Sequence, residues 1–355
     1  MSASNPELER LLVENPNDRA SALVYGDWLA EAGDARGELV QVQLALERAG
    51  GRRGNGKPPR PDTAAAELTE RERALLLAHA VEWAGPIATC AAVELVWRRG
   101  FVDAVLIDHD QLSAEIDKAA LLTELLTRPA GRLVRSLSSR GFDRCNFDDL
   151  PPVLAATRPP LRELIVDLQW SGHIDMHGYA PELGDFGPLW RALPRLEKLT
   201  LVGSSHTLEL GDIDAPQLRH FEAHTPYGLE SGCIESITRA RWPALETLEV
   251  RRCDDRDDEL LRRLCDAVDL PRLQHLGLPE GSFSDAICDR VARSKLLPQL
   301  TTLELGVWDL TVTGARALVE QDRAFAHLSR LRVHYNTIEI EAEALLRGTR
   351  FARLG

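Results

Sequence analysis

The sequence lacks the features that mark secreted and membrane-spanning proteins. Its six cysteines are scattered and include no C-x-x-C pair, which argues against a disulfide framework and favours small buried thiols in a reducing compartment. The longest apolar runs, such as residues 74–81, are too short to cross a bilayer. The first ten residues also lack the apolar stretch of a signal peptide. We therefore expect a cytoplasmic protein without a membrane partner.

Positive charge and catalytic signatures are also scarce. Lys and Arg number 42 against 55 Asp and Glu, which gives a net charge of -13. An acidic chain repels phosphate backbones, so we expect no nucleic-acid partner. Phosphate-binding loops, nucleophile elbows, kinase signatures and the H-E-x-x-H zinc motif are all absent. We therefore expect neither an enzyme nor a bound cofactor.

Residues 1–49 predict a small all-helical domain. Asn5-Pro6-Glu7 is a helix start signal, and Asn15-Pro16-Asn17-Asp18 is a turn followed by a second start. Apolar residues at helical spacing predict the buried side of the second helix; these are Leu23, Val24, Trp28 and Leu29.

The run from Tyr25 to Val40, with Gln43 after it, carries a distinctive pattern. It reads Y-G-D-W-L-A-E-A-G-D-A-R-G-E-L-V and resembles the bacterial repeat-companion domain, whose pattern is roughly Y-A-D-W-L-E-E-x-G-D-x-R-G-E-[FL]-I-x-x-Q. That domain precedes repeat proteins of myxobacteria and planctomycetes, many of them with leucine-rich repeats, and the resemblance implies no enzymatic activity. Gly26 replaces the usual alanine, which we expect to weaken the helix slightly.

The charged residues of this run have two interpretations. In the first, Trp28 lies in the core, while Asp27 and Glu38 pair with Arg36 or cap helix ends. In the second, the same residues form a docking surface for a partner common to the family.

Two segments connect this region to the rest of the chain. Residues 50–65 are rich in Gly, Pro and Arg and predict a flexible basic linker. Residues 66–100 are expected to form a capping helix and the segment that leads into the repeats. Thr69-x-x-Glu72 predicts the capping box of that helix, which runs to about Glu82.

The dominant signal in the remaining chain is the repeated unit L-x-x-L-x-L. Clear copies begin at Leu161, Leu196, Leu218, Leu245, Leu273, Leu300 and Leu328, and degenerate copies begin at Val102 and Val134. From Leu218 onward the spacings are 27, 28, 27 and 28. This period suits the helix-bearing class of leucine-rich repeat similar to ribonuclease inhibitor. The sequence thus predicts an α/β solenoid of about nine repeats over residues 101–355, with a parallel concave sheet and outer helices.

The repeat pattern also predicts which side chains line the concave face. In L1-x2-x3-L4-x5-L6-x7, the third, fifth and seventh positions point away from the core. These positions place Glu222, Glu249 and Glu304 in an acidic stripe that ends in Arg330 and Arg332. The stripe indicates a protein partner with a basic surface. In the alternative interpretation, His220, His275 and Arg251 neutralise it within the protein.

Two further sets of residues complete the candidate site. Trp170, Trp308 and Tyr335 fall just beyond predicted strands, where aromatics serve as binding hot spots or pack beneath a turn. His220-x-Glu222-x-His224 places potential metal ligands on one strand face, but the sequence shows no clear remainder of the coordination shell.

Three functions follow from these patterns. The first is a non-catalytic adaptor or scaffold that binds a protein on its concave face. The alternative is a partner-recruiting subunit of an enzyme complex, docked through the N-terminal helical domain. The third, less favoured, is a metal-dependent hydrolase that uses the strand with His220 and His224.

Overall fold

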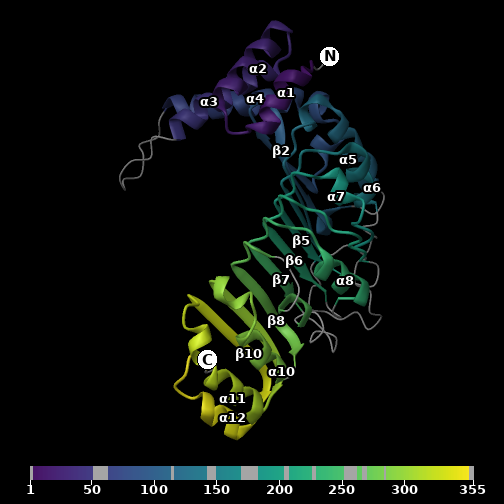
Figure 1. Cartoon of the computed structure of the whole chain (residues 1–355). Coiled ribbons are helices and arrows are strands. Elements are labelled where there is room, and N and C mark those ends of the chain that lie inside the picture. Colours follow the sequence, from purple (N-terminus) through teal and green to yellow (C-terminus); the bar gives the residue numbers. More distant parts are fainter. Residues whose placement is uncertain are drawn as a thin grey trace. The chain divides into compact units, whose positions relative to one another are not determined.

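The computed structural model describes residues 3–50, 63–112, 116–141, 149–168, 183–203, 208–225, 229–251, 262–265, 270–283 and 285–351 (Figure 1). The fold is α/β, with mostly parallel strand pairing. The chain forms two compact units. Unit 1 comprises Met1–Ser139 and Ala156–Leu161, and unit 2 comprises Arg140–Ala155 and Arg162–Gly355. Within the described ranges, no helix is long and apolar enough to cross a membrane. The domain boundaries expected at residues 49, 65 and 100 stay predictions.

Unit 1 begins with the helices α1 (Pro6–Glu14), α2 (Arg19–Glu31), α3 (Arg36–Gly50) and α4 (Thr63–Ala84). The first two start where the sequence predicts. The side chain of Asn5 accepts a hydrogen bond from the Leu8 amide, and Asp18 accepts from the amides that follow it. The start of α4 was predicted wrongly. Thr69 lies inside this helix, and its hydroxyl donates to the Ala65 carbonyl (2.8 Å) instead of forming a cap.

The buried face of α2 also differs from the prediction. The helix buries Ala22, Tyr25, Gly26 and Leu29, which recur at helical spacing and form one stripe. Leu23 and Val24 are 39% and 54% exposed, and Trp28 packs only at the edge of the core. Tyr25 displaces them because its ring fills the core beside Phe101, with centroids 5.1 Å apart, while its hydroxyl bonds to Glu9 (3.0 Å).

A buried ion pair anchors the residues that resemble the repeat-companion pattern. Nη2 of Arg36 lies 2.7 Å from Oδ2 of Asp34, and the two side chains are 0% and 2% exposed. Both groups also bond to the backbone of Ala3. Burial raises the pKa of the Asp34 carboxyl, but hydrogen bonds and charge from Arg36 outweigh it and leave that pKa below its usual value.

The other charged residues of the pattern pair elsewhere, so the expected partners of Arg36 were wrong. Glu38 pairs with Arg71 of α4, at 2.5 and 2.9 Å. Asp27 accepts a hydrogen bond from Gln41 (3.3 Å). Arg36 instead forms its ion pair with Asp34, because the two residues face each other across a tight turn and are two positions apart in the chain. These contacts agree with the first interpretation in that they lie within unit 1, and the docking-surface interpretation stays a prediction.

Close backbone approach explains the glycines of the same run. A Cβ on Gly26 would lie 2.8 Å from Cγ1 of Val40, and one on Gly37 would lie 2.6 Å from the Ala30 backbone. The absence of side chains at these positions lets α2 and α3 pack closely. Gly26 therefore does more than weaken a helix, contrary to the expectation from sequence.

Unit 1 continues with short helices and strands. These are η1 (Pro86–Thr89), β1 (Val93–Arg98), β2 (Phe101–Asp108), η2 (His109–Gln111), α5 (Lys118–Thr127), η3 (Pro129–Gly131) and β3 (Ser136–Arg140). β1 and β2 form an antiparallel hairpin that the repeat pattern does not predict. Gln43 ties α3 to this hairpin by accepting from the Gly100 amide (2.9 Å) and donating to the Trp97 carbonyl (3.3 Å).

Unit 2 contains a parallel run of strands in chain order. These are β4 (Glu163–Asp167), β5 (Lys198–Val202), β6 (His220–His224), β7 (Thr247–Arg251), β8 (His275–Phe283), β9 (Thr302–Leu310) and β10 (Arg330–Ile338). Each begins at the third position of a predicted L-x-x-L-x-L copy. The register pairs equivalent positions, as in Glu163 with Lys198 and Lys198 with His220.

Helices connect these strands. They include α7 (Leu189–Ala192), α8 (Ser231–Arg239), α10 (Ala286–Ala292), α11 (Val312–Glu320) and α12 (Ile340–Leu346), while α6 (Leu150–Thr157) precedes β4. In Figure 1, α7, α8 and α10 lie on one side of the strands. In β4–β9 the fourth and sixth motif positions are buried, as Leu248 and Val250 of β7 show, each 0% exposed. The alternating burial of β6 and β7 leaves one face of these strands without that cover.

Candidate binding site

The partly exposed face of β6–β10 brings most predicted site residues together. We call it the open face and define it by the polar residues, together with Gly277, at the third, fifth and seventh motif positions; its members are His220, Glu222, His224, Thr247, Glu249, Arg251, His275, Gly277, Thr302, Glu304, Arg330, Arg332 and His334. The intervening apolar side chains of β6–β9 point into the core and are buried. The parallel register therefore lines up polar groups from five neighbouring strands.

A single guanidinium bridges two carboxylates on this face. Glu222 and Glu249 lie opposite each other in the β6–β7 ladder. Nη2 of Arg251 lies 2.6 Å from Oε1 of Glu249, and its Nε lies 3.6 Å from Oε1 of Glu222. The two carboxylate side chains are only 23% and 17% exposed. The expected neutralisation within the protein thus exists here, but one cation serves two anions.

Histidines surround the same carboxylates. Nε2 of His220 lies 3.7 Å from Glu222, and Nε2 of His275 lies 3.9 Å from Glu249. Nδ1 of His275 also bonds to the Thr302 hydroxyl on the next strand.

The protein environment lowers the pKa values of Glu222 and His275. The hydrogen bond from His220 lowers the pKa of Glu222 below its usual value, and the charge of Arg251 adds to this against the effect of burial. Burial lowers the pKa of His275, and this effect exceeds the opposing attraction of Glu249 and Glu304. Near neutral pH, Glu222 is therefore ionised and His275 is neutral.

Gly277 interrupts the acidic row. It pairs with both Glu249 and Glu304 in the register, and a Cβ there would lie 3.0 Å from Cγ of Glu249. The predicted stripe is therefore two acidic groups separated by a position without a side chain. The Glu249 side chain packs against the Gly277 backbone, where a larger residue would crowd it.

The second acidic group contains a residue that the predicted site omits. Nε2 of His334 lies 2.7 Å from Oε1 of Glu304. Arg332 lies opposite Glu304 in the ladder, yet among the described residues neither it nor Arg330 forms an ion pair. The place of His334 at the seventh position of its motif copy, beside a glutamate row, is the sequence signal that identifies it.

The predicted aromatic rim is not supported at the positions expected. Trp308 and Tyr335 lie within β9 and β10 and not beyond their ends, because these nine-residue strands continue past the five residues seen in β4–β7. Their side chains, and the whole of Trp170, fall outside the described residues.

The metal hypothesis gains no geometric support. Within the described parts of the chain, no group of three or more His, Cys, Asp and Glu residues is placed to hold a metal ion. His220 and Glu222 lie near each other, but His220 contributes a hydrogen bond that lowers the Glu222 pKa. This contact with the carboxylate and the bridge from Arg251 use the groups that a metal would need.

Comparison with known proteins supports the fold alone. No protein-family model and no curated protein matches the chain. The structure is similar to the crystal structure of a protein from Bacteroides fragilis, a structural genomics target, with a TM-score of 0.56 and 19% sequence identity. The similarity covers 84% of this chain and 86% of that one. At this identity, the two chains share an α/β architecture.

Proposed function

We propose that this chain is a non-catalytic adaptor or scaffold that binds a protein partner on the open face through lysine or arginine side chains of the partner. One observation carries this proposal. Motif positions three, five and seven of β6–β9 hold three carboxylates (Glu222, Glu249 and Glu304) and one guanidinium (Arg251). With neutral histidines, these positions of β6–β9 carry a net charge of −2, whereas β10 adds two positive charges, those of Arg330 and Arg332, to the open face.

The partner's chemistry follows from the arrangement of those charges. Like charges opposite each other in a ladder are destabilising, and both carboxylates near Arg251 are mostly shielded from water. A second cation would lower this repulsion. Gly277 lies between Glu249 and Glu304 in the register, and a partner guanidinium that approaches this position from solvent would form charge-assisted hydrogen bonds to their carboxylates.

We further propose that the fold is a leucine-rich-repeat solenoid of the helix-bearing class. Its support is the strand start at the same motif position in seven copies and a spacing of 27 or 28 residues from Leu218 onward. Stacked repeats leave a long face for another protein. The N-terminal helices α1–α4 would cap the first repeat or dock separately.

The remaining expectations support the same class of protein. Cys233 and Cys288 are buried free thiols, and burial raises the pKa of each to about 12, so neither suits nucleophilic chemistry. Buried thiols of this kind are typical of a reducing compartment, and we propose a cytoplasmic location. The net charge of -13 disfavours nucleic acid as the partner.

A peptide selection tests the proposed chemistry. The purified protein is used to select from a displayed library of random peptides, with counter-selection on the Glu222→Gln/Glu249→Gln variant. The bound pool should be enriched in Lys and Arg, and its affinity should fall about tenfold in that variant, the value of one charge-assisted contact.

A matched control removes the same charge elsewhere. Glu235 of α8 and Glu320 of α11 are exposed residues on helices, and Glu235→Gln/Glu320→Gln should leave the affinity unchanged. A pool without Lys and Arg enrichment, or one that binds both double variants equally, would contradict the proposal.

A further inference from the structure

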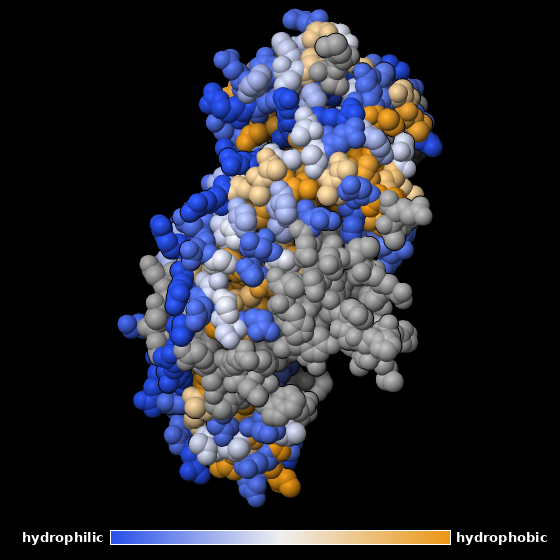
Figure 2. All heavy atoms as spheres, turned by 90° about the vertical axis from the view of Figure 1, so that its right-hand side faces the viewer, coloured by the Kyte–Doolittle hydropathy of each residue, from blue (hydrophilic) through white to orange (hydrophobic). Residues whose placement is uncertain are grey.

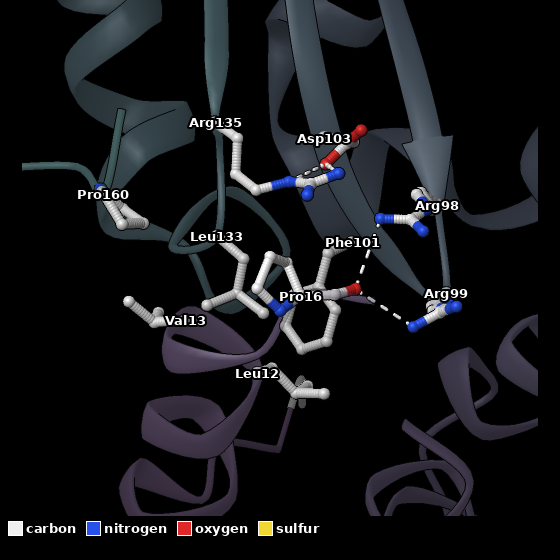
Figure 3. Close-up of a pocket in the computed structure, with 10 residues that line it drawn as sticks. All are labelled: Leu12, Val13, Pro16, Arg98, Arg99, Phe101, Asp103, Leu133, Arg135 and Pro160. Carbon is white, nitrogen blue, oxygen red and sulfur yellow. Dashed lines mark hydrogen bonds and ion pairs between the residues drawn. The ribbon is translucent and has the colours of Figure 1, made fainter. Parts of the chain in front are cut away.

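A small pocket in unit 1 combines an apolar wall with a cationic rim. Its cavity volume is about 40 Å³, within a hollow of about 430 Å³ that includes open solvent. Leu12, Val13, Leu133 and Phe101 contribute apolar surface (Figure 3). Three guanidiniums also line it, those of Arg98, Arg99 and Arg135. The pocket shares no residue with the open face.

Arg99 has a structural role in the wall of the pocket. With Gly100 it forms the two-residue turn between β1 and β2, and both have positive φ values, 51° and 79°. The Arg99 side chain donates to the carbonyls of Pro16 and Asp18, at 3.0 and 3.2 Å, and pairs with Glu47 at 2.9 Å. Its charge is therefore compensated, and it holds the hairpin against the turn between α1 and α2.

Arg135 is compensated as well. Its Nε and Nη2 both lie 2.5 Å from Oδ1 of Asp103. Figure 3 shows this pair on the same side of the pocket as Arg98. Its Nη1 makes no hydrogen bond to any residue that the structure describes. Among the described residues, the Arg135 guanidinium therefore has a donor left for another group in the pocket.

Arg98 carries the uncompensated charge. It donates to the Pro16 carbonyl (3.2 Å) and the Asn17 side chain (3.0 Å), which are neutral. Its only ion pair among the described residues is with Glu47, at 3.7 Å, and that carboxylate also pairs with Arg99 and Arg19. Burial lowers the pKa of Arg98, and the charges of Arg99 and Arg135 lower it further, which outweighs the opposing effect of Asp103 and Glu47. Four guanidiniums (Arg19, Arg98, Arg99 and Arg135) thus face three carboxylates (Glu47, Asp103 and Asp18), which leaves one positive charge.

We propose that this Arg98 pocket binds a carboxylate attached to a compact branched apolar group. The carboxylate would lie between the guanidiniums of Arg98 and Arg135, and the apolar group would pack on Leu12, Leu133 and Phe101. Apolar pockets with a few convergent polar groups are the usual form of small-ligand sites. The C-terminus of a peptide ending in leucine and a free branched acid both have this chemistry.

Amide NMR titration separates the contributions of charge and shape. The probes are N-acetyl-leucine, its neutral analogue N-acetyl-leucinamide, and 4-methylpentanoate. N-acetyl-leucine or 4-methylpentanoate should shift the Phe101 and Leu133 amide signals saturably, and N-acetyl-leucinamide should bind at least about tenfold more weakly, since it loses a charge-assisted contact. Stronger binding of N-acetyl-leucine indicates a peptide terminus as the ligand, and stronger binding of 4-methylpentanoate indicates a free acid.

Three variants identify the pocket. Arg98→Gln should weaken binding of the carboxylate probes about tenfold, while Val13→Trp should abolish it by filling the space with all charges retained. The control Arg10→Gln lies on α1 with a side chain that is 68% exposed, and it should bind as wild type does. Thermal unfolding confirms that each variant is folded. Saturable binding that survives both pocket variants, equal binding of the neutral amide, or no saturable shift up to about 20 mM would overturn the proposal.

Discussion

Glu222 of β6 lies directly opposite Glu249 of β7, and the guanidinium of Arg251 contacts both carboxylates. Two like charges at opposed ladder positions repel each other. The protein places them on a face that is only partly exposed and supplies one cation for the pair. The stability of these strands and the affinity for a basic partner therefore depend on the same three side chains.

Removing the bridging cation should destabilise unit 2. We expect Arg251→Met to lower the free energy of unfolding by about 1 kcal/mol at pH 7, because the opposed carboxylates then repel each other without compensation. Urea unfolding at pH 7 measures this. The control Arg239→Met removes an exposed arginine of α8 paired with Glu235 and should cost less than about 0.5 kcal/mol. Equal stability of the two variants would show that the bridge contributes nothing.

His275 should make stability depend on pH between neutrality and mild acid. Folding lowers its pKa below the usual 6.5, so the unfolded chain takes up the proton first. The stability that this residue contributes is complete above about pH 6.5 and is lost as the pH falls through its folded-state pKa. The groups acting on it are Glu249, Glu304, His220 and Arg330.

Two measurements check this prediction. Histidine-resolved NMR titration should give a His275 pKa below 6.5. Urea unfolding at pH 7.5 and 5.5 should show a smaller stability difference for His275→Gln than for wild type. A His275 pKa above 6.5 would reverse the sign and contradict the prediction.

The buried ion pair of unit 1 should be much more sensitive than an exposed one. Arg36→Met leaves the Asp34 carboxylate buried without its cation, and we expect a loss of about 3–5 kcal/mol. The matched control Arg71→Met breaks the exposed pair with Glu38 and should cost less than about 1 kcal/mol. Chemical denaturation followed by helical circular dichroism measures both. If both variants lost a similar amount of unfolding free energy, burial of the ion pair would not explain its contribution to stability.

Gly26→Ala should destabilise unit 1 although it raises helix propensity. The added Cβ would meet Val40 at 2.8 Å, and overpacking of this kind costs about 1–3 kcal/mol. The control Gly232→Ala in α8 meets nothing within 4 Å and should stabilise by about 0.5–1 kcal/mol. Combining Gly26→Ala with Val40→Ala should cost less than the sum of the single changes. Additive losses in that double variant would show that the contact is not the cause.

The repeat pattern was sufficient to locate the strands of unit 2. Its fixed spacing places a strand at the third position of each copy, and the two-residue alternation assigns side chains to faces. The alignment of Glu222 with Glu249 follows directly. The pattern does not show where a strand ends, so Trp308 and Tyr335 were placed beyond strands that in fact include them.

Most of the features that could not be predicted from the sequence depend on contacts between segments that are distant in the chain. The pairing of Glu38 with Arg71 joins residues of different helices, and the pocket around Arg98 draws on α1, the β1–β2 hairpin and the segment near Leu133. No local pattern records such contacts. The misassigned face of α2 has a different cause, because apolar residues occur on both of its sides and only packing selects Tyr25 over Val24.

The most direct test of the account is quantitative capture of a partner from a lysate of the native host. Wild type, Glu222→Gln/Glu249→Gln and Glu235→Gln/Glu320→Gln serve as three baits, and mass spectrometry compares the captured proteins. The account predicts a protein that is retained by wild type and by the helix control, is lost from the open-face variant, and contacts the open face through a segment rich in Lys or Arg. A partner retained equally by all three baits would contradict the assignment of binding to the open face.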